Sequence, residues 1–160
     1  MRAGPVRATG EAGLSRASGE EISLSGSVVR SHAWPIAVGY FGSKGRGVFA
    51  TTDVAADRLL ERCPVLIIPE QDRSVVDRTI VFTYVYMWEP NTTEQDLYSG
   101  RGRAAIALGL ASLLNHSYDP NATFIRHFDE LELELRSLRS IRAGEEITID
   151  YQMRLWFDPA

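Results

Sequence analysis

The chain has 160 residues, a formal net charge of −4 at pH 7 and one cysteine, Cys63. A single cysteine excludes a disulfide framework and a cysteine-rich structural zinc site built from this chain alone. The acidic balance argues against direct nucleic-acid binding, because proteins of that class usually carry a basic surface. No apolar run approaches the roughly 18 residues of a membrane span. We therefore expect a soluble protein with no membrane segment.

The first 33 residues differ in composition from the rest. Residues 1–33 contain five Gly, six Ser and five Ala, and no Phe, Trp or Tyr. Such a stretch buries too little apolar surface to offset the entropy that is lost on ordering. We predict a mostly disordered tail over residues 1–33, with weak order around Ile22–Val29, and a folded domain over residues 34–160.

The first part of the domain alternates apolar segments with turns. Residues 34–41 and 48–51 are predicted strands, and the glycine-rich residues 43–47 form the turn between them. Residues 59–69 are again apolar, but Pro64 lacks the N–H that a central strand uses. This segment is therefore predicted to bend or to form an edge strand.

The middle of the chain contains the one good helix candidate. Residues 70–78 read as a polar connection, and the β-branched and aromatic residues 80–88 predict a strand. Residues 104–114 are rich in Ala, Leu and Ile and predict a helix. Gly109 weakens that helix by about 1 kcal/mol relative to alanine.

The last part of the chain reads as strands. Residues 122–128 are a predicted strand, and Leu131, Leu133 and Leu135 alternate with charged residues. This period of two predicts a strand with its leucines buried and its acidic residues facing solvent. Residues 147–151 form the final strand. Many short strands and one short helix together predict a small, mainly β domain.

The run Lys44-Gly45-Arg46-Gly47 precedes a predicted strand. Its two glycines let a ligand or another backbone come close, because neither carries a Cβ atom. A phosphate-binding loop is a poor match, since no third glycine stands at the right place and no helix follows. On its own the run predicts a tight turn.

The run Asn115-His116-Ser117-Tyr118-Asp119-Pro120-Asn121 is a polar turn after the candidate helix. A serine hydrolase is disfavoured because no Gly-x-Ser-x-Gly elbow is present. A metal site is disfavoured because His32, His116 and His127 show no recognised ligand spacing. By itself the run predicts an Asn- and Asp-rich turn.

The run Glu145-Glu146-Ile147-Thr148-Ile149-Asp150-Tyr151 contains the last predicted strand. Alternation along a strand puts Ile147 and Ile149 on one side of it. The same phase places Tyr151 on the isoleucine side, where a buried hydroxyl needs a partner or a cavity.

In this order and spacing, the three runs resemble the SET domain family of protein lysine methyltransferases, in a compact, bacterial-type form. The resemblance covers roughly residues 36–157. The matching runs are Gly45-Arg46-Gly47-Val48-Phe49-Ala50, Ser112-Leu113-Leu114-Asn115-His116-Ser117-Tyr118-Asp119-Pro120-Asn121-Ala122 and Arg142-Ala143-Gly144-Glu145-Glu146-Ile147-Thr148-Ile149-Asp150-Tyr151. The first run is weakly specific, whereas the second and third in this order are highly specific.

The resemblance implies a mainly β, β-clip-like fold of several small curved sheets with one or two short helices. It implies a C-terminal knot-like crossing that brings the Asn115-His116 segment beside the final strand. The cofactor would be S-adenosylmethionine, bound on one side, and a substrate lysine would enter a narrow channel from the other.

The resemblance also assigns residues to these roles. Lys44, Gly45, Arg46 and Gly47 would hold the methionine part of the cofactor, together with Asn115 and His116. Tyr151 would be catalytic, at the end of the lysine channel. The further assignments are Tyr84 for catalysis and cofactor contact, Trp156 for cofactor contact, and Tyr86, Ile149 and Phe157 for the substrate channel.

The implied reaction needs a neutral lysine amine, whose reference pKa is about 10.4. A dry channel and the positive charge of the cofactor would both lower the pKa of that amine. Neither a metal nor a strong base is then required, and the sequence predicts no metal site.

Many family members close the lysine channel with a cysteine-rich zinc segment, which the single Cys63 does not permit. The wall would then come from Trp156 and Phe157 or from a homodimer partner, or the channel would have no such wall. The first hypothesis is a methyltransferase acting on a protein that presents a lysine. The alternative is a noncatalytic SET-like module that binds a peptide or partner, and a hydrolase using His116 is a remote third. A bacterial-type member would be cytoplasmic, and a eukaryotic one nuclear.

Overall fold

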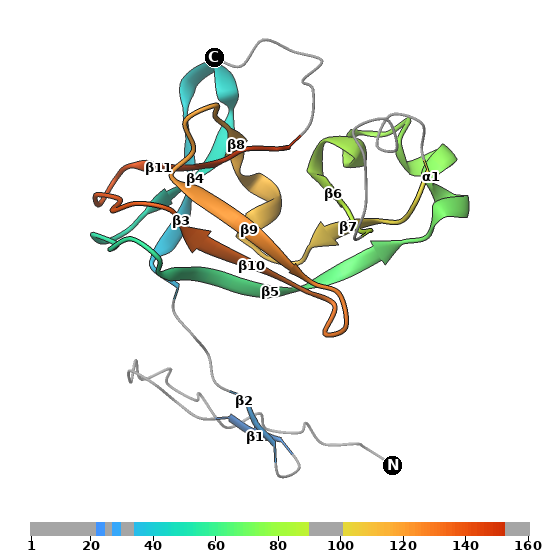
Figure 1. Cartoon of the computed structure of the whole chain (residues 1–160), viewed down its shortest axis with the longest axis horizontal. Coiled ribbons are helices and arrows are strands. Elements are labelled where there is room, and N and C mark those ends of the chain that lie inside the picture. The colour runs from blue at the N-terminus through green and yellow to red at the C-terminus, as the bar shows by residue number, and fades with distance from the viewer. Residues whose placement is uncertain (1–21, 25–26, 30–33, 90–100, 153–160) are drawn as a thin grey trace, which may run out of the picture. The chain divides into compact units, whose positions relative to one another are not determined.

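The computed structural model describes residues 22–24, 27–29, 34–89 and 101–152 (Figure 1). The chain divides into two compact units, Met1–Ala33 and Trp34–Ala160. In the first unit, β1 (Ile22–Leu24) and β2 (Ser27–Val29) pair as a short antiparallel hairpin. The sequence predicts weak order in this segment. The rest of the tail predicted over 1–33 lies outside the described residues.

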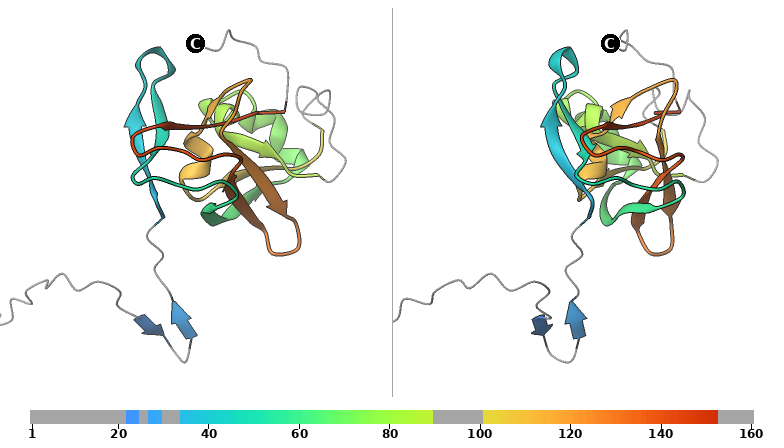
Figure 2. Two further views of the ribbon diagram at one scale, coloured as in Figure 1. Left: turned by 60° about the vertical axis from the view of Figure 1, so that its left-hand side comes forward. Right: turned by 90° about the vertical axis from the view of Figure 1, so that its left-hand side faces the viewer.

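The second unit contains a four-stranded sheet in the order β3-β4-β11-β8. Its strands are β3 (Ile36–Tyr40), β4 (Arg46–Ala50), β11 (Glu146–Ile149) and β8 (Asn115–His116). A 3-10 turn, η1 (Gly42–Lys44), joins β3 to β4. Strands β8 and β11 run parallel, with Asn115 opposite Thr148 and His116 opposite Ile149. The expected meeting of the Asn115-His116 segment with the final strand is confirmed, and Figure 2 shows that strand crossing the β3–β4 hairpin.

The other sheet of this unit has five strands in the order β6-β7-β5-β10-β9. They are β6 (Val85–Met87), β7 (Ala104–Ala107), β5 (Leu59–Ile68), β10 (Glu132–Ser137) and β9 (Ala122–His127). The prediction of a bent or edge strand over residues 59–69 is wrong in its position, because β5 lies at the centre of the sheet.

Pro64 is accommodated because it lies where β5 changes partners. Its N-terminal half pairs with β10 up to Pro64, and its C-terminal half pairs with β7 from Val65 onward. The carbonyl oxygen of Pro64 accepts from Leu108 N at 2.9 Å, while Val65 N donates to Leu131 O at 2.9 Å. The missing N–H of proline therefore interrupts neither ladder.

Side chains connect the two edge strands of the five-stranded sheet. The rings of Tyr86 on β6 and Phe124 on β9 have centroids 4.9 Å apart. Arg126 Nη1 on β9 donates to the carbonyl oxygen of Met87 on β6 at 2.7 Å. Since β6 and β9 stand at opposite ends of the strand order, the sheet curls until its edges meet through side chains.

The buried side chains of both sheets form one hydrophobic cluster. Its largest fully buried members are Trp88, Leu60, Leu133, Leu135, Ile141, Ile147, Ile149 and Val48. The strands predicted over residues 34–41, 48–51, 122–128 and 147–151 are confirmed as β3, β4, β9 and β11. The mainly β fold of curved sheets is confirmed. No helix among the described residues is long and apolar enough to cross a membrane.

The alternation predicted for β10 holds for Leu133 and Leu135, which are fully buried. Leu131 departs from it, because this residue lies in the turn before β10 with φ 55° and is exposed. The acidic face is also wrong in part. Glu134 is buried and accepts from Arg136 Nη2 at 2.8 Å, so its carboxylate faces a cation rather than solvent.

The helix predicted over residues 104–114 is wrong. These residues form strand β7 and, after Gly109, a single 3-10 turn, η3 (Leu110–Leu113). The small side chains of Ala104, Ala105 and Ala107 are buried in a strand that lies between β5 and β6. Packing on both sides of this strand outweighs the helix propensity of alanine.

Helical turns occur instead in the segment before β6. Helix α1 (Glu70–Val76) replaces the predicted polar connection, and η2 (Ile80–Tyr84) replaces the first part of the strand predicted over residues 80–88. Helix α1 follows Pro69 and has Glu70 and Asp72 in its first turn, where negative charge favours a helix. These local signals were present in the sequence.

Candidate active site

The turn between β3 and β4 contains two glycines in opposite environments. Gly45 has φ +76°, which suits glycine, and no atom of the described residues lies within 4 Å of the position that its Cβ would occupy. At Gly47 a Cβ would lie 2.6 Å from Asn115 Nδ2 and 3.0 Å from Glu146 Oε1. The sequence predicts that a neighbouring group comes close to these glycines. This happens at Gly47, whereas Gly45 leaves open space beside the turn.

One carboxylate joins the side chains around Gly47. Glu146 Oε1 accepts from Asn115 Nδ2 at 2.8 Å, and its Oε2 accepts from Lys44 Nζ at 3.1 Å. Asn115 Nδ2 also donates to the carbonyl oxygen of Arg46 at 3.3 Å. The side chains of Lys44 and Glu146 keep 27% and 16% of their surface exposed, so solvent reaches both charges. An amide, a cation and an anion thus lie side by side next to the open turn.

Strand order explains why these residues meet. Strand β11 lies between β4 and β8, so Glu146 reaches the Lys44–Gly47 turn on one side and Asn115 on the other. Asn121, at the end of the polar run 115–121, forms hydrogen bonds to the backbone of β11. Its buried amide donates to Glu146 O at 2.7 Å and accepts from Thr148 N at 2.9 Å.

His116 is buried beneath the end of β11. Its Nδ1 accepts from the backbone N–H of Tyr151 at 3.2 Å, which assigns the proton of the neutral ring to Nε2. The buried Nε2 has no hydrogen-bond partner within the described part of the chain. Burial lowers the pKa of His116 below its ordinary value, against the opposing effect of the Asp150 carboxylate. His116 is therefore neutral near pH 7.

Tyr151 follows directly after the final strand. Its hydroxyl donates to the carbonyl oxygen of Leu114 at 2.7 Å, and its ring packs edge-on against His116 with centroids 5.3 Å apart. Burial, assisted by the nearby Glu146 charge, raises the pKa of Tyr151 to about 12. The hydroxyl keeps its proton at neutral pH and directs it away toward Leu114, which leaves the oxygen lone pairs as acceptors.

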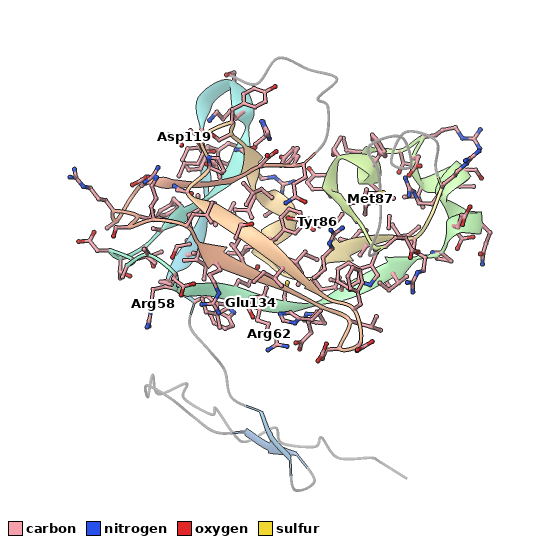
Figure 3. All side chains as sticks on the ribbon, viewed as in Figure 1. Arg58, Arg62, Tyr86, Met87, Asp119 and Glu134 are labelled. Carbon is pink, nitrogen blue, oxygen red and sulfur yellow. The ribbon has the colours of Figure 1, made fainter. Side chains whose placement is uncertain are left out.

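Tyr86 repeats this arrangement from the other sheet; it is labelled in Figure 3 beside Met87. Its hydroxyl donates to the carbonyl oxygen of Ala111 at 2.7 Å. Burial, with the neighbouring Tyr151 as the next cause, raises the pKa of Tyr86 well above its ordinary value. Ala111 lies in η3, and Leu114 is the residue that ends it. One short 3-10 turn therefore holds both tyrosine hydroxyls.

Tyr84 and Tyr86 both fall in the segment predicted as one strand over residues 80–88, but they belong to different elements. Tyr84 is the last residue of η2, whereas Tyr86 belongs to β6. The hydroxyl oxygen of Tyr84 accepts from Arg46 Nη2 at 3.3 Å, so Tyr84 reaches the Lys44–Gly47 turn. Ile149 is buried in β11 opposite His116.

The structure gathers the predicted residues of the three runs, together with Tyr84 and Tyr86, into one region. Trp156 and Phe157 lie outside the described residues. Glu146 was missed as a site residue, although the paired glutamates of its run were a visible signal. Within the described residues no group of three or more His, Cys, Asp or Glu side chains could hold a metal ion.

Comparison with known proteins identifies a family and several relatives that this chain resembles. The SET domain family matches residues 45–152. A histone-lysine N-methyltransferase of Schizosaccharomyces pombe, specific for H3 lysine-37, is 30% identical over 132 residues, which cover 82% of this chain and 80% of that protein. The mouse histone-lysine N-methyltransferase SMYD3 is 55% identical over 40 residues, which cover 25% of this chain and 9% of that protein.

A solved structure shares the fold. The Neurospora SET domain protein DIM-5, a histone lysine methyltransferase, superposes with a TM-score of 0.56 at 21% identity. The match covers 79% of this chain and 55% of DIM-5. The family match extends over most of the folded unit and includes the glycine turn, the Asn115-His116 segment and Tyr151. The chain belongs to the SET domain family.

Proposed function

We propose that the protein is an S-adenosylmethionine-dependent methyltransferase that modifies the side-chain amine of a lysine in a protein substrate. The observation that carries this proposal is the parallel pairing of β8 with β11. It brings Asn115 and His116 beside Tyr151 and beside the glycine turn. The SET family membership and the histone-lysine methyltransferases among its relatives support the same function.

The residues around Gly45 fit the amino-acid end of this cofactor. That end carries an ammonium and a carboxylate, and the site offers Lys44 and Glu146 as opposite charges, with the Asn115 amide on the other oxygen of the Glu146 carboxylate. The turn provides space as far as the structure describes the chain, because no described residue lies within 4 Å of the missing Cβ of Gly45. Lys44, Asn115 and Glu146 would hold the cofactor there, exchanging their present contacts for contacts with it.

When bound, the cofactor would supply a methyl group on a positively charged sulfur, and a neutral amine would attack the methyl carbon and displace the sulfur. The phenol oxygens of Tyr86 and Tyr151 are suited to accept hydrogen bonds from such an amine, since their protons point to Ala111 and Leu114. Both accept through neutral oxygens that retain their protons, so neither consumes the nitrogen lone pair. Their contribution is alignment, and oriented reactants gain several kcal/mol from that effect.

The buried surroundings of these tyrosines favour a neutral lysine. A dry site disfavours the charged ammonium form and lowers the pKa of the amine. The transfer would form a carbon–nitrogen bond as the carbon–sulfur bond breaks, leaving a neutral thioether. The methylated ammonium would then release a proton to water. In this scheme His116 does not have to act as a base, and the reaction does not require a metal ion.

The first test is calorimetric titration of the folded protein with S-adenosylmethionine and, as a control, with adenosine. We expect binding of the intact cofactor and much weaker binding of adenosine, which lacks the charged amino-acid end. Lys44→Met should weaken binding of the cofactor and leave that of adenosine unchanged. If the folded protein does not bind the cofactor, the result would contradict the proposed enzymatic activity and favour a noncatalytic peptide-binding module.

The second test identifies the substrate. The relative in fission yeast is named for H3 lysine-37, so recombinant histone H3 and a peptide centred on that lysine are the first probes. Radiolabelled cofactor is followed into these probes and into a lysine peptide array, and mass spectrometry locates the methyl group. We expect transfer to lysine in at least one probe and none when that lysine is replaced by arginine.

A further inference from the structure

A buried carboxylate lies behind the two tyrosines. Glu61 on β5 is only 4% exposed. Its Oε1 accepts from Leu110 N at 2.9 Å and its Oε2 accepts from Ala111 N at 2.8 Å. Those two amides belong to the first turn of η3. The family resemblance assigned no role to Glu61, and none of the predicted site residues in the described part of the chain forms a hydrogen bond with it.

The charge of Glu61 is balanced by amide dipoles rather than by a cation. No Lys, Arg or His of the described chain forms an ion pair with it. An uncompensated buried carboxylate is costly, so the two N–H groups at the start of η3 are strongly held in place. Burial, with the charge of Glu61 as the next cause, raises the pKa of the neighbouring Cys63 thiol to about 12. Cys63 thus remains a neutral neighbour.

The backbone beside η3 is shaped around this carboxylate. A Cβ at Gly109 would lie 2.6 Å from Glu61 Oε1 and 2.8 Å from its carboxylate carbon. Gly109 itself has φ −144°, an extended conformation open to any residue. Cys63 Cβ would lie 2.9 Å from the same added Cβ. The need for glycine at this position therefore comes from crowding by Glu61 and Cys63 and not from backbone strain.

The peptide groups of η3 connect Glu61 to the site. Ala111 is held from both sides, with its N–H on Glu61 and its carbonyl on the Tyr86 hydroxyl. Three residues later, the carbonyl of Leu114 accepts the hydroxyl of Tyr151. A rigid 3-10 turn of this length transmits a shift at its first amides to both carbonyls.

We propose that Glu61 is a positioning residue, which anchors η3 so that its carbonyls hold the Tyr86 and Tyr151 hydroxyls where the substrate amine is aligned. This inference rests on the proposed methyltransferase function. The role of Glu61 is indirect, since it contacts neither tyrosine by a hydrogen bond.

The test compares Glu61→Gln with Glu132→Gln. Glutamine keeps the size of Glu61 but presents an amide group to one of the two N–H donors. Glu132 lies on the neighbouring strand β10 and pairs with Arg62 at the surface, which makes it the matched control. Methyl transfer is measured on whichever histone H3 or array peptide the wild type modifies, at saturating peptide and over a range of cofactor concentrations.

We expect Glu61→Gln to lower kcat about 10- to 100-fold, the range that small misplacements of reacting groups produce. The KM for the cofactor should change less than about threefold, because the Lys44–Gly47 turn and Glu146 are untouched. Glu132→Gln should leave both constants unchanged. A purely structural role would lower the melting temperature without this division between kcat and KM.

Gly109→Ala disturbs the same contact from the opposite side. It should reproduce the loss of kcat, and the double variant with Glu61→Gln should be no slower than the worse single variant. If Glu61→Gln does not fold, Gly109→Ala carries the comparison. Wild-type kcat in either folded variant would overturn the proposal.

Hydrogen exchange separates this inference from the proposed function. The amides of Leu110 and Ala111 are expected to be protected in the wild type and to lose protection in Glu61→Gln, but not in Glu132→Gln. Unprotected amides in the wild type would refute the anchoring role whatever the activity. If these amides are protected in a wild-type protein that binds no cofactor and transfers no methyl group, the proposed methyltransferase function would be refuted. The anchoring of η3 by Glu61 would not.

Discussion

The hydroxyl of Tyr151 donates to the carbonyl oxygen of Leu114 over 2.7 Å, across 37 positions of the chain. Its proton is committed, so its oxygen is available to orient a substrate amine. Tyr151→Phe removes that acceptor and should lower kcat about 100-fold, since alignment is its contribution. Cofactor affinity should stay within about twofold, and radiolabelled methyl transfer together with calorimetry checks both values.

Tyr118→Phe is the matched control for this variant. The Tyr118 ring packs against His116 at 4.6 Å between centroids, while its side chain is 77% exposed. Phenylalanine keeps the ring contact and removes only a surface hydroxyl, so the rate should not change. A Tyr151→Phe variant that is as active as Tyr118→Phe would remove Tyr151 from the catalytic site.

Gly47→Ala should weaken cofactor binding. The added Cβ would lie 2.6 Å from Asn115 Nδ2 and 2.8 Å from Phe41 Cδ2, so the Asn115 amide must move. Loss of one such hydrogen bond corresponds to about 1–1.5 kcal/mol, or roughly tenfold in the dissociation constant. Calorimetric titration with S-adenosylmethionine measures it.

The control is Gly39→Ala, at the position directly opposite Gly47 in the β3–β4 ladder. The three atoms nearest to a Cβ there belong to the Phe49 and Phe41 rings, with the shortest distance at 3.0 Å. This substitution should affect stability more than cofactor affinity. Equal losses of affinity in the two variants would show that the ladder, and not Asn115, is responsible.

His116 should make stability depend on pH. Its pKa in the folded protein is lowered by burial below the ordinary value of 6.5. Between the folded pKa and 6.5, the unfolded chain binds more protons, so the free energy of unfolding rises with pH through this window. The contribution is fully present above about pH 6.5 and declines as the pH falls below it.

Urea unfolding of the wild type and of His116→Asn between about pH 5 and 7.5 tests this dependence. Asparagine does not titrate, so the slope in this window should decrease. The lowered pKa values of Glu134 and Glu145 act in a separate window, below their ordinary value of 4.5. An NMR titration midpoint for His116 at or above 6.5 would contradict the prediction.

Asn121→Ala should destabilise the fold strongly. The substitution leaves the backbone groups Glu146 O and Thr148 N without the partner that they have in the wild type. Each unsatisfied buried group costs about 1–3 kcal/mol, so we expect a loss of about 2–4 kcal/mol in the free energy of unfolding. Ser117→Ala, which removes a hydroxyl that accepts from the exposed amide of Asp119, should cost about 1 kcal/mol or less. Chemical denaturation distinguishes the two.

Local pattern predicted some of the secondary structure and misled elsewhere. The β-branched and aromatic alternation of β9 and the isoleucines of β11 predicted strands that the structure contains. The alanines of β7 predicted a helix, because propensity is local, while their burial between β5 and β6 is a long-range effect. Pro64 predicted a bend or an edge strand. Its central position in the sheet depends on the change of partner strand at Pro64, which cannot be read from one segment of the sequence.

The sequence by itself determined the family, because three short runs in fixed order carry residues that only a close-packed site requires. Gly47, Asn115 and Tyr151 could all be named from those runs. Only the tertiary structure decided which groups share a contact. The hydrogen bond between Lys44 and Glu146 joins residues that are 102 positions apart in the chain. The hydrogen bond between Ala111 and Glu61 joins residues that are 50 positions apart. Such contacts depend on strand order and on the curl of the sheet, which no local pattern encodes.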